Sequence, residues 1–202
     1  MKKLLFTLTV ISYALITSAQ SKIGEYQLSY FKKSYDIDAS QNKNDTSKYE
    51  YYIDCASADN LHKQVCLIVH SKNLDEFIEY LNTNKQIYDK WSKTAKENNV
   101  SELDKNVETK GFKCSSGFVY GDWNFDFHVL VTSRVKIIDG KMYLIFSSGT
   151  LQSSTNQFMK HDGLLLVFSS PGEVDDFISK ININEVRKFF AGKNKTDQLF
   201  KN

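Results

Sequence analysis

Arginine is scarce in this chain: Arg134 and Arg187 are the only two among 26 basic side chains. The guanidinium group of arginine binds phosphate or carboxylate through two parallel hydrogen bonds. The chain therefore has few side chains that can bind such anions in this way. The net charge is also small, +2 for the full chain. A nucleic-acid-binding protein needs a surplus of cationic side chains, and a membrane-surface protein needs a cationic face. The composition argues against both classes.

Cysteine, histidine and glycine are few as well, at three, four and nine residues. No histidine has a second His, Cys or carboxylate at a metal-ligand spacing, so we expect no metal site and no cofactor. The glycines mark turns and form no phosphate-binding loop.

The longest apolar run is short and lies at the N-terminus. It extends from Leu4 to Ile16, follows two lysines, and is followed by the small residues Thr17 to Ala19. This pattern is typical of a secretory signal peptide and is too short for a membrane span. We therefore expect residues 1–19 to be removed before Gln20, with no transmembrane segment afterwards. Their loss removes two lysines and no acid, which brings the formal charge to zero.

The clearest pattern lies between residues 112 and 148. From Trp123 to Ile137 apolar residues fall on one parity of the numbering and polar residues on the other, with one exception on each. A period of two is the pattern of a strand with one buried face. Two tight-turn signals, Gly121-Asp122 and Asp139-Gly140, flank the stretch. The sequence therefore predicts three antiparallel strands.

Each two-residue turn fixes a register. The second turn predicts the pairs Ile138–Lys141, Ile137–Met142, Val135–Leu144 and Ser133–Phe146. The first turn predicts the pairs Tyr120–Trp123, Phe118–Phe125, Ser116–Phe127 and Cys114–Val129. Both registers gather apolar residues on a single face, so we predict that Phe125, Phe127 and Val129 belong to the core.

The opposite face of these strands carries polar side chains of mixed character. The candidate ligand-binding residues on it are Asn124, His128, Thr132, Arg134 and Tyr143. With no dominant charge, this surface suits neutral polar groups or a protein better than a polyanion.

A hydrolase is the alternative interpretation of the same face. The predicted register puts His128 opposite Ser115, with Asp126 two residues along, so that hydroxyl, imidazole and carboxylate approach one another. An open sheet surface lacks the cleft and oxyanion hole that this chemistry needs. We therefore assign no catalytic residue and favour a role in binding over an enzyme.

Two capped helices complete the pattern. Asn73 and Glu76 fit a capping box, and apolar residues then recur at helical spacing. They are Leu74, Phe77, Leu81, Tyr88, Trp91 and Ala95, with Asn84 as the one polar member. Ser170 and Pro171 begin a second helix. Both helices need an apolar partner, so we predict an α+β fold: a mostly antiparallel sheet with two main helices packed on one face.

An internal similarity bears on domain organisation. The segments CLIVHSKNLDEFIEYL from Cys66 and LLLVFSSPGEVDDFISKI from Leu164 both contain an apolar strand, a serine, an acidic pair and Phe-Ile. They are either two copies of a strands-then-helix unit or two unrelated capped helices after buried strands. We expect a single domain over residues 20–202, with halves at 20–106 and 107–192 as the alternative.

Three cysteines leave at least one thiol free. If residues 49–57 and 64–70 form a hairpin, Cys55 lies across from Cys66 at a separation that a disulfide can bridge. A bridge and two free thiols both stay open at this point. Cys114 is interpreted as a small core residue.

The stretch KQIYDKW, followed by TAKENNV and a further lysine, resembles uncharacterised secreted proteins of Gram-negative bacteria over about thirty residues. That resemblance carries no known activity. Together with the leader it implies a periplasmic or secreted protein of such a bacterium.

Two classes of function follow. The first is an exported binding or interaction module of the cell envelope, whose partner is a protein, a glycan or a small molecule. The second is the hydrolase. The polar stretch from Gly149 to Gly163 is either a long loop or a continued edge ribbon, and it is the second candidate for the binding site.

Overall fold

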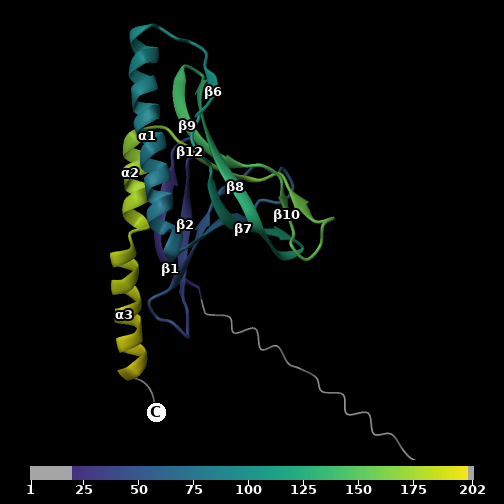
Figure 1. The fold of residues 1–202 in the computed structure, drawn as a ribbon, viewed down its shortest axis with the longest axis vertical. Coiled ribbons are helices and arrows are strands. Elements are labelled where there is room, and N and C mark those ends of the chain that lie inside the picture. The colour runs from purple at the N-terminus through teal and green to yellow at the C-terminus, as the bar shows by residue number, and fades with distance from the viewer. Residues whose placement is uncertain (1–19, 200–202) are drawn as a thin grey trace, which may run out of the picture.

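A computed structural model describes residues 20–199, so the predicted signal peptide lies outside the described residues. The fold is α+β, as predicted. Figure 1 shows helices α1 (Leu74–Glu97), α2 (Pro171–Lys180) and α3 (Ile183–Leu199) together on one side of the molecule. The strands are β1 (Ser21–Leu28), β2 (Lys33–Gln41), β3 (Tyr49–Asp54), β4 (Ala56–Ser57), β5 (Val65–His70), β6 (Asp104–Asn106), β7 (Phe112–Tyr120), β8 (Asp122–Ile138), β9 (Lys141–Ser148), β10 (Leu151–Gln152), β11 (Lys160–His161) and β12 (Leu164–Phe168).

Ten strands form one antiparallel sheet in the order β1-β2-β3-β5-β7-β8-β9-β12-β4, with β6 pairing β8. Strand β4 comes directly after β3 in the chain but pairs with β12 at the far end of this order. The sheet therefore curls back toward its own beginning. One face is enclosed and holds most of the core, and the other is turned outward.

Helices α1 and α2 cover the enclosed face. The predicted stripe of α1 is confirmed, because Leu74, Phe77, Leu81 and Tyr88 are all buried. Ser170 caps α2 by accepting a hydrogen bond from the Glu173 N–H at 3.2 Å. The capping box at Asn73 is wrong: a short 3₁₀ turn over Ser71–Asn73 leads into α1, and the Asn73 side chain makes no cap bond.

The polar member of the α1 stripe is explained by its partners. Asn84 is fully buried, and its amide N–H donates to the Tyr80 carbonyl at 2.8 Å. Its carbonyl oxygen accepts from the hydroxyls of Ser133 at 2.5 Å and Thr109 at 3.3 Å. These contacts join the helix to β8 through a satisfied buried network.

The hairpin between β8 and β9 has the predicted register. Asp139 and Gly140 both have positive φ, at 49° and 73°. The four predicted pairs across this turn, from Ile138–Lys141 to Ser133–Phe146, are all present.

The hairpin between β7 and β8 corrects the sequence prediction. Tyr120 pairs with Asp122 around Gly121 alone, so the turn is one residue shorter than predicted and Phe125 lies opposite Gly117. A bulge follows, with two residues of β8 opposite one of β7, and it restores the predicted pair Cys114–Val129.

The bulge changes which side chains face the core. Val129 is 4% exposed, as predicted. Phe125 and Phe127 are 37% and 57% exposed, so their assignment to the core is wrong. Residues on one parity are outward before the bulge and inward after it, because the extra residue shifts the alternation by one.

The three cysteines are free thiols. Asp54, not Cys55, lies opposite Cys66. Cys55 follows Asp54 and packs in the enclosed core, whereas Cys66 points to the outward face, so the two thiols lie on opposite sides of the sheet. Burial raises the pKa of Cys66 to about 12.

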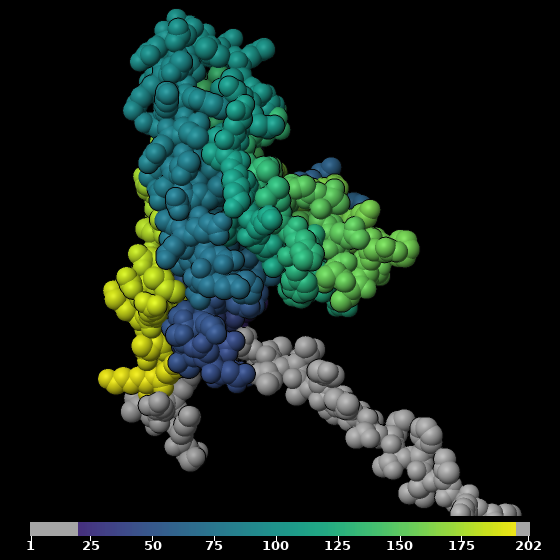
Figure 2. Space-filling view, viewed as in Figure 1, coloured from purple at the N-terminus to yellow at the C-terminus, as the bar shows by residue number. Residues whose placement is uncertain are grey.

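Residues 149–163 form a continued ribbon rather than a long loop. Strands β10 and β11 pair with each other, and the ribbon occupies the side of β8 that β9 leaves free after Ser148. In Figure 2 it projects from the body of the molecule as a separate lobe.

Candidate functional site

The first half of β8 and the tip of the ribbon enclose an open cleft. The backbone N–H of Ser154 donates to the Phe125 carbonyl at 2.8 Å and so attaches the ribbon to the strand. A second attachment is the hydrogen bond from the Gln152 N–H to Asp126 Oδ2, at 2.9 Å. The cleft therefore has one wall on the bulge and one on the ribbon, and two backbone N–H groups of the ribbon join the walls by donating to the Phe125 carbonyl and the Asp126 carboxylate.

The lining of this cleft is polar and mostly uncharged. Its volume is about 620 Å³, and it is lined by Asp126, His128, Gln152, Ser153, Ser154, Thr155, Asn156, Gln157 and Phe158. Amides and hydroxyls supply both donors and acceptors. Phe158 is 84% exposed and adds an apolar surface at the rim. Asp126 is already engaged, because its Oδ1 accepts the His128 N–H at 2.9 Å and its Oδ2 accepts from Gln152.

The predicted ligand-binding residues do not share one site. His128 lies in the cleft. Asn124 is on the enclosed side of the sheet, opposite Phe118, and its amide donates to the Asp122 carbonyl at 2.8 Å. Its prediction on the outward face is wrong, because the bulge lies between it and the rest of that face.

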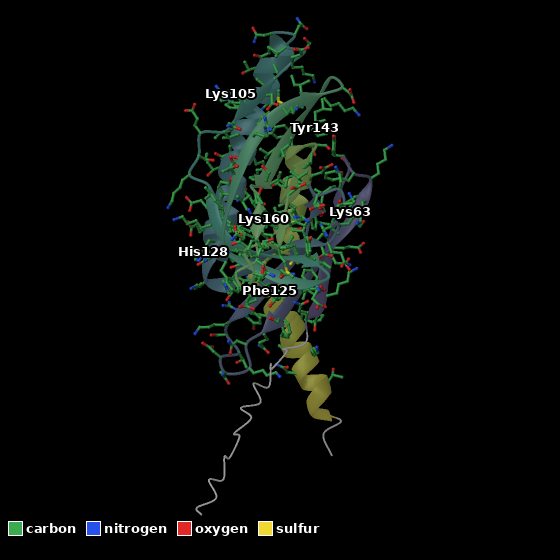
Figure 3. The ribbon with its side chains drawn as sticks, turned by 90° about the vertical axis from the view of Figure 1, so that its right-hand side faces the viewer. Lys63, Lys105, Phe125, His128, Tyr143 and Lys160 are labelled. Atoms are coloured by element: carbon green, nitrogen blue, oxygen red, sulfur yellow. The ribbon has the colours of Figure 1, made fainter. Side chains whose placement is uncertain are left out.

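The other three predicted residues lie farther along the sheet. Thr132 is exposed on β8, and Arg134 forms an ion pair with Asp104 on β6. Tyr143 is nearly buried and packs edge-on against Tyr30, with ring centroids 5.0 Å apart. Figure 3 labels Tyr143 near the top of the molecule and His128 well below it, on the other side.

The alternative catalytic arrangement is not formed. Both oxygens of Asp126 accept backbone N–H groups, and the hydrogen bonds of residues 20–199 include none between Ser115 and His128. Ser115 is 9% exposed and lies beside the bulge, where the register differs from the predicted one. The geometry gives no support to a hydrolase at this position.

A serine–histidine pair that the sequence did not indicate lies at the base of the ribbon. Ser57 Oγ and His161 Nε2 are 3.1 Å apart. The Gly163 N–H donates to His161 Nδ1 at 3.0 Å, so Nδ1 carries no proton and Nε2 carries one. The Nε2–H donor lies 2.9 Å from the His62 carbonyl. His161 cannot accept a proton from Ser57 in this tautomer, so the pair holds the ribbon and does not activate a nucleophile.

The comparisons with known proteins add no family. No family model matches the chain, and no curated protein or solved structure matches it. Within residues 20–199 no helix has the length and apolar character to cross a membrane. The same residues contain no group of three or more His, Cys, Asp or Glu side chains placed to hold a metal ion.

Proposed function

We propose that this protein is an exported binding module of the bacterial cell envelope and that the cleft between the β8 bulge and the ribbon holds its ligand. The observation that carries the proposal is the lining, in which neutral hydrogen-bonding side chains outnumber every other kind. Ligand sites commonly combine a concave surface with a few convergent polar groups. Export is proposed on the signal-peptide pattern of residues 1–19.

The chemistry of the lining favours a neutral, hydroxyl-rich ligand such as a glycan. A charged ligand needs an opposite charge that is free to meet it, and the one carboxylate in the cleft already accepts two backbone N–H groups. Hydroxyl groups both donate and accept, which matches the amides of Gln152 and Gln157. Phe158 offers an aromatic surface for the apolar side of a sugar ring.

The test is an array of neutral oligosaccharides probed with the mature protein. Gln157→Ala removes from the cleft an exposed amide that forms no hydrogen bond within residues 20–199, and should weaken binding by about 2- to 10-fold, the cost of one neutral hydrogen bond. Thr132→Ala is the matched control, since Thr132 is an exposed polar residue of β8 outside the cleft. The proposal fails if no neutral glycan binds, or if the control weakens binding as much as the cleft variant.

A further inference from the structure

The outward face of β8 carries three large aromatic side chains in a row. Trp123, Phe125 and Phe127, the aromatic row, are 51%, 37% and 57% exposed. The rings of Phe125 and Phe127 are nearly parallel, with centroids 6.5 Å apart. Scattered apolar residues are normal on a protein surface, but a contiguous aromatic group marks a contact site.

The floor beside the aromatic row is built from small residues. Gly117 lies opposite Phe125, and a Cβ at this position would be 3.2 Å from the Trp123 ring and 3.3 Å from the Phe125 ring. The same Cβ would lie 3.1 Å from Cys66 Sγ. The rings therefore lie over a backbone surface that only glycine leaves open.

The sheet register connects the aromatic row to two carboxylates. Phe125 pairs with Gly117, Gly117 with Cys66, and Cys66 with Asp54, so all four residues lie on the outward face. Asp38 joins them on β2, because it lies opposite Tyr52 on the same face as Asp54. Three strand spacings separate Asp54 from Phe125, which is about 14 Å.

These carboxylates, Asp38 and Asp54, form no salt bridge among the described residues, although Lys22 lies opposite Asp38 in the register and Lys33 lies near Asp54. Lys22 pairs with the neighbouring Asp36 at 2.8 Å, but no ion pair within residues 20–199 reaches Asp38 or Asp54. Partial desolvation, together with the charges of Asp38 and Asp36, raises the pKa of Asp54 to about 6. The three carboxylates do not form a metal-binding group. The carboxylates of Glu25, Asp36, Asp38 and Asp54 outnumber the two ammonium groups beside them, those of Lys22 and Lys33, so this part of the outward face carries a net negative charge.

We propose that the outward face of the sheet docks a basic, extended segment of a partner protein. Its apolar side chain lies on the aromatic row, and its lysine or arginine meets Asp54 and Asp38. Both features favour a cation, since exposed aromatic rings attract ammonium and guanidinium groups as the carboxylates do. A segment that crosses the strands covers the separation in about four residue steps, so its basic anchor lies about four positions from its apolar anchor.

This surface is distinct from the cleft, because the cleft lies at the edge of β8 and the aromatic row on its face. The carboxylates oppose nucleic acid and an anionic membrane. A neutral membrane surface would bind the aromatic row and would not need Asp38 or Asp54. The experiment below distinguishes this case from a basic peptide.

The experiment selects a phage library of random dodecapeptides against the mature protein. Enriched peptides should combine lysine or arginine with apolar residues, and their affinity should fall with added salt. Trp123→Ser with Phe125→Ser, and separately Asp38→Asn with Asp54→Asn, should each weaken the selected peptides by at least about tenfold. Because all four side chains are at the surface or lack partners, melting curves should show both variants folded.

Gln157→Ala is the matched control and should bind the peptides as the wild type does, which separates this proposal from the glycan site. The inference is overturned if no peptide is enriched, if the enriched peptides carry no net positive charge, or if the Asp38→Asn, Asp54→Asn variant binds them equally well. Flotation with neutral phosphatidylcholine vesicles that depended on the aromatic row alone would also overturn it.

Discussion

Two alanine substitutions, one in the β8 bulge and one just after it, test the orientation of that strand. Phe127 precedes Val129 by two residues, so an unbroken strand would put both on the same face. In the structure Phe127 is 57% exposed and Val129 is 4% exposed. Val129 lies in the main core cluster, whereas Phe127 borders a shallow surface hollow with Ile68.

We expect the smaller residue, Val129, to cost more stability on substitution than the larger Phe127. Val129→Ala removes two buried methyl groups and leaves a small cavity, which should cost about 2 to 3 kcal/mol. A buried Phe→Ala change costs about 3 to 5 kcal/mol. Removing an exposed ring loses little buried surface, so Phe127→Ala should cost less than about 1 kcal/mol.

Thermal or denaturant unfolding of the mature protein measures both costs. For a domain of this size each kcal/mol shifts Tm by roughly 2–4 °C. Val129→Ala should therefore lower Tm by about 4–12 °C and Phe127→Ala by less than about 4 °C. A Phe127→Ala variant that loses 3 kcal/mol or more would refute the bulge and restore the unbroken strand.

Three further predictions concern buried and charged groups. Asn84→Ala should cost about 2–4 kcal/mol in denaturant unfolding, because it leaves the buried Ser133 hydroxyl without its partner; an unchanged midpoint would contradict the network. Asp54→Asn should stabilise the protein at pH 7 by less than about 1 kcal/mol, because solvent screens this exposed carboxylate, and should leave Tm at pH 4 unchanged. The pKa of Asp54 in the folded protein, about 6, lies above the ordinary 3.8, so the wild type loses stability as the pH rises from about 4 to 6 and this carboxyl group ionises. An increase in Tm that is equal at pH 7 and pH 4 would contradict this pKa shift. Ser170→Ala should cost about 1 kcal/mol of helix capping, whereas Asn73→Ala should cost almost nothing, and equal losses in the two variants would contradict the caps described here.

Local turn chemistry and periodicity predicted much of the fold. Asp139-Gly140 requires positive φ at both positions, and few other arrangements of the chain satisfy it, so the β8–β9 register followed from the sequence. The α1 stripe followed from its spacing, and the Ser170 cap from its residue types.

The bulge was hidden because the apolar parity runs through it unbroken. Trp123, Phe125 and Val129 share one parity in the sequence, although the first two face outward and the third faces inward. Alternating apolar and polar residues show only that neighbours point to opposite faces of the sheet. A bulge residue exchanges the inward and outward faces, and the alternation in the sequence can continue unchanged. Gly117 was the available signal, since a glycine inside a strand marks a bulge or a close approach.

The candidate site was predicted in pieces. His128 and the 149–163 stretch were each candidates, but as alternatives. Their proximity depends on the end of β9 at Ser148 and on the contacts of Ser154 and Gln152 with β8. Such long-range contacts leave no periodic trace in the sequence.

The fluorescence of Trp123 tests the central claim, that the first half of β8 turns its aromatic side chains to solvent. The chain has two tryptophans, so a Trp91→Phe variant isolates Trp123. Emission like that of tryptophan in water, quenched readily by acrylamide, is the predicted result, because Trp123 is half exposed. Blue-shifted emission protected from the quencher would place Trp123 in the core and contradict both the bulge and the outward aromatic row.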